Sequence, residues 1–440
     1  MRLPNPPLPS PILLGFSGGL DSSVLLQLLA TDPGIRSRGL RALHVHHGLH
    51  ADADAWAAHC RRVCAALDVP LEVVRVQVNL SAGLGVEGAA RAARHAAFAA
   101  ALGDGEILAL AHHRDDQAET FLLRALRGAG ADGLAAMRPW RRHARGWLWR
   151  PLLELPRAAL QDHAASQHLQ WIDDPANMNA DFDRNFLRNA VLPLLRQRWP
   201  DAPGSFARSA ALCAQAVDLL ETEDAAALAA ARGDPQTLEI RMLQAMPEAR
   251  RARVLRRWIA DLQLPPLPGN GIARIEHELL ASRRDASPQF DWQGARVWRW
   301  RGLLHADVQR ASLPTDWAQA WDGRAALLMP AGERLQLVGA PGFDAPLRVH
   351  ARQGGERIVL PGRRHSHALK HVLQHAGMPP WQRARLPLLS AANGSLLAAG
   401  DKILSAPMAA WLSAHGAHLS LSRPVPERAE GDSGGTAALA

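Results

Sequence analysis

The sequence has no tyrosine, three cysteines and no long uninterrupted apolar run. Three cysteines in 440 residues cannot build the disulfide framework of a secreted domain. A transmembrane helix needs about 20 apolar residues in a row. Prolines interrupt residues 1–19, where a signal peptide would be continuously apolar. We therefore expect a soluble protein, located in the cytoplasm and without a membrane partner.

Lysine is scarce as well: Lys370 and Lys402 are the only two, so arginine supplies nearly all of the positive charge. Basic residues outnumber acidic ones by 50 to 42. The planar guanidinium of arginine suits phosphate recognition because it donates two parallel hydrogen bonds. An arginine-rich composition is also typical of GC-rich genomes, so the position of the charge is more informative than its sum. The length allows roughly two to four domains with sizeable cores.

Short apolar runs alternate with helical stretches from residue 12 to about residue 200. The pattern predicts strands at 12–16, 42–45, 71–78 and 107–110, and helices at 22–30, 55–67, 89–102 and 116–126. Such alternation is typical of a parallel sheet covered on both faces, so the expected fold class is α/β and Rossmann-like. The loops that begin at Ser17, His46 and Ala111 then share the carboxyl rim of the sheet, where ligands bind.

Three further regions follow the predicted N-terminal domain, residues 1–205. Residues 206–325 are expected to form a mainly helical middle domain, in which Trp292, Trp298 and Trp300 alternate and indicate a small strand pair. Residues 326–422 are expected to form a small basic α/β domain. The small, polar tail at 423–440 is predicted to be disordered.

The most informative motif is Ser17-Gly18-Gly19-Leu20-Asp21-Ser22, between a predicted strand and a predicted helix. Its glycines allow the backbone to approach a phosphate, and the helix N-terminus offers unpaired N–H groups. Asp21 would repel a phosphate unless a divalent cation lay between them, which predicts Mg²⁺ here. The motif lacks the lysine and the spacing of a Walker A loop. The alternative is a glycine turn followed by an ordinary helix cap.

This loop resembles the SGGxDS loop of the ATP pyrophosphatases, whose domain is termed adenine nucleotide alpha hydrolase-like. Other segments resemble, in order and spacing, the tRNA(Ile)-lysidine synthetases. They are residues 44–50, 85–94, 111–120, 150–153, 173–177, 184–189, 352–357 and 379–383. Residues 111–120, AHHRDDQAET, match without a gap. The sequence departs from the family pattern at His50, where arginine is usual, and at His95, where tyrosine is usual.

The resemblance implies a carbon–nitrogen ligase that uses ATP and Mg²⁺. It would join free L-lysine to carbon 2 of the wobble cytidine in the CAU anticodon of an isoleucine tRNA. An adenylated cytidine is the implied intermediate, and AMP and pyrophosphate are the implied by-products. Lysidine at this position changes decoding from AUG to AUA and the identity of the tRNA from methionine to isoleucine.

Asp116 and Glu119 stand three apart on a predicted helix, so their carboxylates share one face and could hold a cation or an ammonium group. The resemblance selects the lysine ammonium. The predicted catalytic residues are Asp21, Asp116, Glu119 and Arg91, the last stabilising charge on the adenylated cytidine. Mg²⁺ is assigned to Asp21 and Asp115. The predicted ATP-binding residues are Ser17, Gly18, Gly19, Leu20, Asp21, Ser22, His46 and His112.

Basic residues concentrate near the C-terminus: eight of them and one acid lie between Arg348 and Arg385. Such a concentration is the footprint of a phosphate-backbone partner, and its alternative is a solvated surface. The predicted tRNA-binding residues are Arg184, Arg188, Arg352, Arg357, Arg363, Arg364, Lys370 and Arg383. Residues 138–150 mix five arginines with three tryptophans, which indicates either base stacking or a hairpin with a tryptophan core.

Three alternatives remain open at this level. Cys60 and Cys64, four apart on a predicted helix, could carry sulfur as in thiolases with the same ATP loop, or could simply be buried. His112 and Asp116, also four apart, could contribute to a transition-metal site. A tRNA-binding module with a degenerate ATP site is the third, although intact Asp21, Asp116 and Glu119 argue against it.

Overall fold

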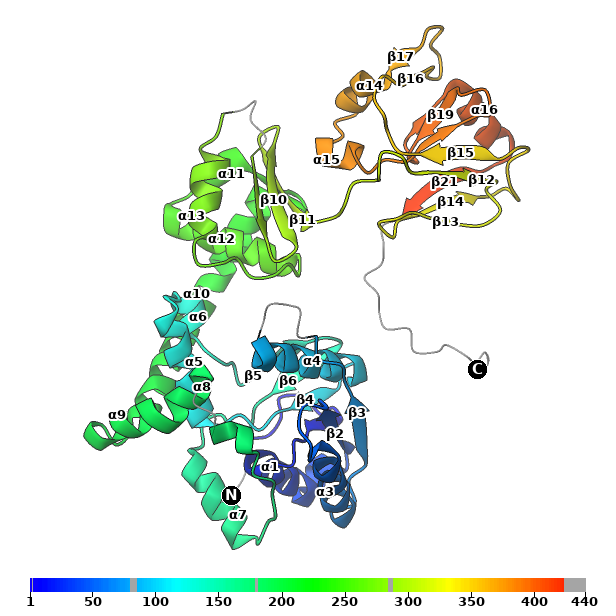
Figure 1. Cartoon of the computed structure of the whole chain (residues 1–440). Helices are drawn as coiled ribbons and strands as arrows, with labels where there is room; N and C mark the ends of the chain where they lie inside the picture. The colour runs from blue at the N-terminus through cyan, green and yellow to red at the C-terminus, as the bar shows by residue number, and fades with distance from the viewer. Residues whose placement is uncertain (2, 80–84, 179–180, 284–287, 423–440) are drawn as a thin grey trace. The chain divides into compact units, whose positions relative to one another are not determined.

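The computed structural model describes residues 1, 3–79, 85–178, 181–283 and 288–422. The chain divides into two compact units, Met1–Ala227 and Leu228–Ala440 (Figure 1). The tail at 423–440, for which we predicted disorder, lies outside the described residues. Within the described ranges, no helix combines the length and the apolar character that crossing a bilayer requires.

Unit 1 is built around a six-stranded sheet of order β3-β2-β1-β4-β6-β5 (Figure 1). Neighbouring strands are parallel except for the β5–β6 hairpin. This arrangement confirms the predicted parallel α/β fold, with strand limits close to those expected. The strands are β1 (Ile12–Gly15), β2 (Leu40–His46), β3 (Leu71–Arg75), β4 (Ile107–Ala109), β5 (Trp140–His143) and β6 (Gly146–Trp149).

Both faces of this sheet are covered, because alternate residues of each strand point to opposite faces. Ile12 and Leu14 of β1 pack in one core cluster with Leu25 of α1, whereas Leu13 packs in another with Phe98 of α4. The helical segments of unit 1 are α1 (Leu20–Thr31), α2 (Pro33–Arg36), α3 (Ala53–Ala66), α4 (Gly85–Ala101), α5 (Arg114–Leu126), α6 (Ala131–Leu134), α7 (Arg157–Ser166), η2 (Pro175–Met178), α8 (Asp183–Phe186), the π-helix η3 (Leu187–Val191), α9 (Leu192–Arg198) and α10 (Ala202–Ala231).

The middle region contains more strand than we expected. The predicted tryptophan strand pair is present as β9–β10, but it belongs to a five-stranded antiparallel sheet of order β7-β8-β11-β10-β9. Two neighbouring strands of this sheet, β7 and β8, have three residues each, too few to show an alternating pattern. The elements are β7 (Arg232–Asp234), β8 (Thr237–Glu239), α11 (Ile240–Gln244), α12 (Glu248–Asp261), α13 (Gly271–Arg274), the π-helix η4 (Ile275–Leu280), β9 (Gln289–Trp292), β10 (Ala295–Trp300) and β11 (Leu303–Val308).

The C-terminal region is a small α/β domain, as predicted, with sheets of five, three and two strands. Apolar side chains of β12, β15 and β18 form its core with α16. Its elements are β12 (Ala318–Trp321), β13 (Leu327–Leu328), β14 (Arg334–Val338), β15 (Leu347–His350), β16 (Arg357–Ile358), β17 (His367–Ala368), α14 (Leu369–His375), α15 (Pro380–Arg383), β18 (Leu388–Ser390), β19 (Leu396–Ala399), β20 (Ile403–Leu404), α16 (Ala406–Ala414) and β21 (His418–Ser422).

The domain limits of the sequence analysis remain predictions. Helix α10 runs through the predicted limit between residues 205 and 206, and the two units divide within the same helix, between Ala227 and Leu228. Pro203 and Gly204 lie just before the predicted limit, whereas residues 205–232 contain neither proline nor glycine to mark the boundary at 227–228, which explains the difference in position.

Candidate active site

The loop between β1 and α1 holds a glycine where no other side chain fits. Gly18 has a φ of +85°, and a Cβ there would lie 2.7 Å from Cδ1 of Ile172 and 2.9 Å from Sγ of Cys60. The amide of Ile172 donates to the carbonyl of Gly18 at 2.9 Å, which brings the segment preceding residues 173–177 against this loop. Glycine supplies both the left-handed backbone and the close approach.

Asp21, in the first turn of α1, carries an oxygen that is available to a cation. Its Oδ1 is buried and has no hydrogen-bond partner in the described part of the chain. Next to it, the hydroxyls of Ser17 and Ser22 lie 3.0 Å apart, and the Ser22 hydroxyl donates to the carbonyl of Gly19. An unpartnered buried carboxylate oxygen fits a hard divalent cation, because such an oxygen is costly to bury alone.

Asp115, the second residue assigned to Mg²⁺, has protein partners on both oxygens. Its Oδ2 accepts from the amide of Arg157 at 2.9 Å, and its Oδ1 accepts from the guanidinium of Arg196. These contacts tie the start of α5 to α7 and α9. Of the two predicted Mg²⁺ residues, Asp21 therefore fits without rearrangement, whereas Asp115 would first have to release a partner.

Asp116 and Glu119 share one face of α5, as predicted, and two arginines cover them. Arg184 Nε lies 2.7 Å from Glu119 Oε2, and Arg184 Nη2 lies 2.9 Å from Asp116 Oδ1. Arg188 Nε lies 2.6 Å from Glu119 Oε1, and its Nη2 lies 3.0 Å from both Asp116 Oδ1 and Glu119 Oε2. The predicted lysine-binding pair and two predicted tRNA-binding residues thus form a single ion cluster.

The cluster is well shielded from solvent: the side chain of Glu119 is 0% exposed and that of Asp116 is 10% exposed. Burial alone would raise the pKa of Asp116, but the positive charges of His113, Arg184 and Arg188 lower it well below the ordinary value. The carboxylates in turn raise the pKa of Arg184 and Arg188 against the effect of burial. Asp116 is therefore ionised at neutral pH.

His113 is a site residue that the sequence analysis did not select. Its Nε2 lies 3.6 Å from Asp21 Oδ2 and 3.4 Å from Asp116 Oδ2, so it connects the glycine loop with the carboxylate pair. Burial lowers its pKa, but the carboxylates of Asp116, Asp21 and Asp115 outweigh burial and raise it. His113 also caps α5 in a reciprocal capping box with Asp116. The sequence signal that could have identified His113 is its place three positions before Asp116, the spacing of a helix N-cap and its capping-box partner.

His112 and His46, both predicted to bind ATP, have protein partners. Nδ1 of His112 accepts from Nε of Arg150 at 3.2 Å, and burial lowers the pKa of His112 well below its ordinary value, so the ring is neutral. His46 has a weaker contact: its Nε2 lies 3.2 Å from Oδ1 of Asp54 but makes no hydrogen bond among the described residues. A neutral His112 could offer a phosphate at most an N–H group, without a charge.

Arg91 lies on α4 and is exposed. Desolvation and the like charge of Arg184 lower the pKa of Arg91. Burial and the charges of Arg91 and Arg184 lower the pKa of Arg94 to about 10. Neither Arg91 nor Arg94 lies within salt-bridge distance of a carboxylate among the described residues. Two further guanidiniums therefore lie close to Arg184, with Glu87 as the opposing charge that acts on both.

Unit 1 contains the two cysteines, the histidine–carboxylate segment and the tryptophan-rich segment for which the sequence left alternatives open. Cys60 and Cys64 are buried, and desolvation raises their pKa to about 12 and about 11, so neither is a reactive thiolate. In the ranges that the structure describes, no group of three or more His, Cys, Asp or Glu residues could hold a metal ion. The 138–150 segment is the β5–β6 hairpin, in which Trp140 and Trp147 stack at 5.0 Å, as the hairpin interpretation requires.

The predicted tRNA-binding residues of the C-terminal domain fall into two groups. Arg357, Arg363, Arg364 and Lys370 are exposed on or beside the β16–β17 hairpin, although Arg357 also donates to the hydroxyl and the carbonyl of Ser366. Arg352 and Arg383 are half-buried and make contacts within the domain: Arg352 lies 3.7 Å from Glu356, and Arg383 donates to the carbonyl of Met378 at 2.6 Å.

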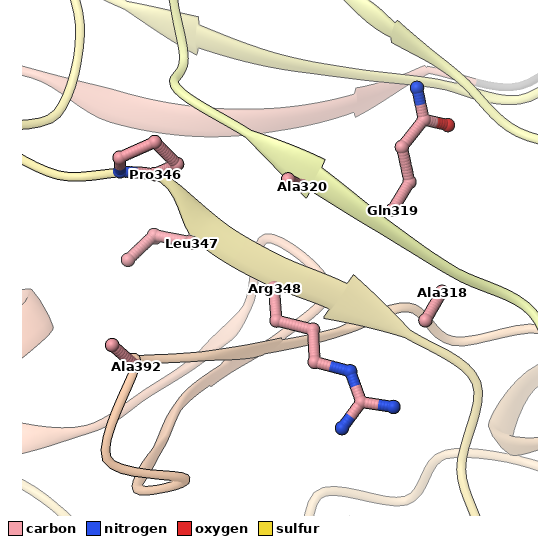
Figure 2. Close-up of a pocket in the computed structure, with 7 residues that line it drawn as sticks. All are labelled: Ala318, Gln319, Ala320, Pro346, Leu347, Arg348 and Ala392. Atoms are coloured by element: carbon pink, nitrogen blue, oxygen red, sulfur yellow. The ribbon is translucent and has the colours of Figure 1, made fainter.

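A hollow of about 340 Å³ lies along β12 and β15 of the same domain (Figure 2). Arg348 is the charged residue of its lining, and the hollow contains neither a carboxylate nor a glycine-rich loop. It has none of the groups that the predicted ATP and lysine sites require. The lining residues are Ala318, Gln319, Ala320, Pro346, Leu347, Arg348 and Ala392.

Comparison with known proteins decides the family. Residues 2–195 match the model of the PP-loop domain, residues 238–305 that of the TilS substrate binding domain and residues 347–421 that of the TilS substrate C-terminal domain. The tRNA(Ile)-lysidine synthase of Xanthomonas axonopodis pv. citri (strain 306) is 57% identical over 93% of this chain and 94% of its own length. The chain belongs to the tRNA(Ile)-lysidine synthase family. It is thus a ligase with an ATP-using PP-loop domain at residues 2–195.

Two further similarities concern a second relative and a solved structure. The tRNA(Ile)-lysidine synthase of Xanthomonas campestris pv. campestris (strain 8004) is 54% identical over 95% of this chain and 96% of its own length. A crystal structure described as a TILS C-terminal domain is 26% identical over 20% of this chain and 84% of its own, with a TM-score of 0.17. The lysidine synthase relatives thus cover the glycine loop, the middle sheet and the basic C-terminal domain together.

Proposed function

We propose that this enzyme ligates L-lysine to carbon 2 of the wobble cytidine in the CAU anticodon of isoleucine tRNA. The cytidine oxygen at carbon 2 attacks the α-phosphate of ATP and pyrophosphate leaves, which gives an adenylated base. The side-chain amine of lysine then attacks carbon 2, and AMP leaves with the oxygen. The product would decode AUA in place of AUG and carry isoleucine identity. The relatives that match along almost the whole chain carry the name of this activity.

One structural observation supports this chemistry above all others. A glycine loop suited to phosphates, with the unpartnered Oδ1 of Asp21, is connected through His113 to Asp116, which forms one ion cluster with Glu119. The first part is suited to ATP and the second to an ammonium group, which are the reactants other than RNA. Ser17, Gly18, Gly19, Leu20 and Ser22 complete the proposed ATP loop, and Arg91 would stabilise charge on the adenylated cytidine.

The proposed lysine site is Asp116 and Glu119. Two carboxylates attract the ammonium group and hold its carbon chain in one orientation. The amine must lose a proton before it can attack, and a carboxylate beside it can accept that proton. His113 contacts Oδ2 of Asp116, so one oxygen of Asp116 stays occupied. Once an arginine has moved away, the carboxylate of Glu119 is therefore more available than that of Asp116 to accept the proton of the amine.

Mg²⁺ is the implied metal ion, and Asp21 would hold it. When bound, the ion would neutralise charge on the triphosphate and on the leaving pyrophosphate. The fit rests on the unpartnered Oδ1 of Asp21, whereas Asp115 would join only by giving up Arg157 or Arg196.

The proposed RNA surface of unit 2 consists of Arg357, Arg363, Arg364 and Lys370. Exposed guanidinium and ammonium groups can displace counterions from a phosphate backbone. Arg352 and Arg383 would support this surface indirectly, because their side chains bond within the domain.

The experiment is transfer of labelled lysine to a transcript of isoleucine tRNA with a CAU anticodon, with and without ATP. ATP-dependent labelling by the wild type that falls at least about a hundredfold in Asp116→Asn supports the proposal. The matched control is Asp68→Asn, which removes an exposed carboxylate paired with Arg36 and should leave labelling unchanged. Incorporation of sulfur in place of lysine would instead make the enzyme a thiolase.

A further inference from the structure

Every oxygen of the proposed lysine site already has a partner. Arg184 and Arg188 together occupy both oxygens of Glu119 and Oδ1 of Asp116. Oδ2 of Asp116 accepts from the amide of His113 at 3.0 Å. An ammonium group that entered here would add a further positive charge to those of Arg184, Arg188 and His113 around two carboxylates. A lysine amine therefore cannot bind this pair until at least one guanidinium has left.

The two arginines are placed so that they can leave. They stand four apart on the continuous helical segment of α8 and η3, so both guanidiniums reach the carboxylates from the same side. Their side chains are 18% and 27% exposed, whereas Glu119 is 0% exposed. The carboxylates are fixed in the body of unit 1, and the guanidiniums are the solvent-facing members of the cluster.

A phosphate is the chemical group that would draw them off. Arginine binds phosphate oxygens through the same paired hydrogen bonds that it gives to a carboxylate. The charge of Arg184 lowers the pKa of both Arg91 and Arg94, whereas the carboxylate of Glu87 acts on both in the opposite direction. An incoming anion would therefore meet three guanidiniums where Glu87 and Asp116 supply the opposing charge. A phosphate bound by Arg91, Arg94 and Arg184 would satisfy three guanidiniums and weaken the hold of Arg184 on Asp116.

We infer that Arg184 and Arg188 keep the carboxylate pair closed to free lysine until a phosphate of a bound substrate takes over their guanidiniums. This inference rests on the proposed function, in which Asp116 and Glu119 bind lysine. The two arginines then serve as positioning residues with two alternating partners. Lysine binds to the carboxylate pair only after RNA or ATP is bound, so its amine meets a cytidine that is ready to be activated.

The test is equilibrium dialysis of labelled L-lysine against the full chain under four conditions. They are protein alone, with the CAU transcript, with a non-hydrolysable ATP analogue, and with both. We expect the lysine Kd of the wild type to fall about tenfold when the effective phosphate source is added, since the closed state is then displaced. The two single additions show whether RNA or ATP supplies that phosphate.

The decisive variant is Arg188→Gln, which retains Arg184 on the pair and alters a partly exposed side chain, so the fold should persist. Without RNA or ATP it should bind lysine about tenfold more tightly than the wild type and gain little from either addition. Arg188→Lys should restore most of the dependence of the lysine Kd on RNA or ATP, because the new side-chain ammonium can again pair with Asp116 and Glu119. The matched control is Arg127→Gln, an exposed arginine paired with Asp183, which should behave as the wild type.

The outcomes separate this inference from the proposed function. A wild-type Kd that is equal in all four conditions, together with an unchanged or weaker Kd in Arg188→Gln, would overturn the inference and make the arginines permanent partners. If lysine binding also survives Asp116→Asn, the pair is not the lysine site, and that part of the proposed function fails. If Asp116→Asn abolishes binding while the wild-type Kd is equal in all four conditions and Arg188→Gln gains no affinity, the inference alone is refuted and the lysine site stands.

Discussion

The Glu119→Gln substitution tests how strongly the ion cluster holds unit 1 together. It keeps the volume of the side chain but removes the charge that accepts hydrogen bonds at 2.7, 2.6 and 3.0 Å from Arg184 and Arg188. Breaking a buried pair on one side typically costs about 3–5 kcal/mol, because it leaves an uncompensated buried charge. Glutamine can still accept one of these bonds, so we expect a loss of about 3 kcal/mol in the free energy of unfolding of unit 1.

The assay is urea unfolding followed by hydrogen exchange, which resolves the amides of α5 and α8 from those of unit 2. The matched control is Glu278→Gln. Glu278 accepts from Arg274 through two bonds of 2.7 and 2.9 Å, but both side chains are more than 40% exposed. Exposed pairs contribute little, so the control should be close to the wild type. A loss in Glu119→Gln as small as that of the control would refute the argument from burial.

Three further predictions concern the other parts of the site. Because the carboxylates raise the pKa of His113 above 6.5, charged His113 stabilises unit 1 fully below that pH and less as pH rises through the raised value. Unfolding measured against pH should show this decline in the wild type, and a decline of equal size in His113→Asn would contradict it. Gly18→Ala should weaken ATP binding at least about tenfold, since a Cβ would meet Ile172 and Cys60 at a positive φ. Gly105→Ala, where φ is +72° and nothing lies within 4 Å of the Cβ, is the calorimetric control and should bind ATP normally. Replacement of Arg363 and Arg364 by glutamate should lower the salt slope of tRNA binding by about 2 and leave ATP binding intact. The control is Arg334→Glu, which should keep the wild-type salt slope. Equal slopes in the two variants would exclude Arg363 and Arg364 from the RNA surface.

Much of unit 1 was predictable because its signals are local. An apolar strand, two glycines and a helix start lie within ten residues of one another around Gly18, and alternation of strands with helices specifies a parallel sheet. The carboxyl rim then follows from topology, which explains why the loops after β1 and β4 meet at Asp21 and His113. The common face of Asp116 and Glu119 follows from helical spacing alone.

The partners of these residues could not be predicted in the same way. Arg184 and Arg188 lie more than sixty residues after Asp116 and Glu119, and no periodicity records that the two segments pack together. The sequence analysis therefore assigned carboxylates to lysine and arginines to RNA, without the conflict that their contact creates. The short strands β7 and β8 were missed for a related reason, since long-range pairing and not local pattern makes them strands.

The central claim is tested most directly by comparing CAU transcripts with transcripts in which the wobble cytidine is replaced by uridine. Wild-type enzyme is incubated with ATP and labelled lysine, and the labelled nucleotide and the released AMP are both quantified. The account predicts label only at the wobble cytidine of the CAU transcript, with one AMP formed for each lysine incorporated. Folded enzyme that binds ATP and both transcripts but transfers no lysine, or that labels the two equally, would contradict it.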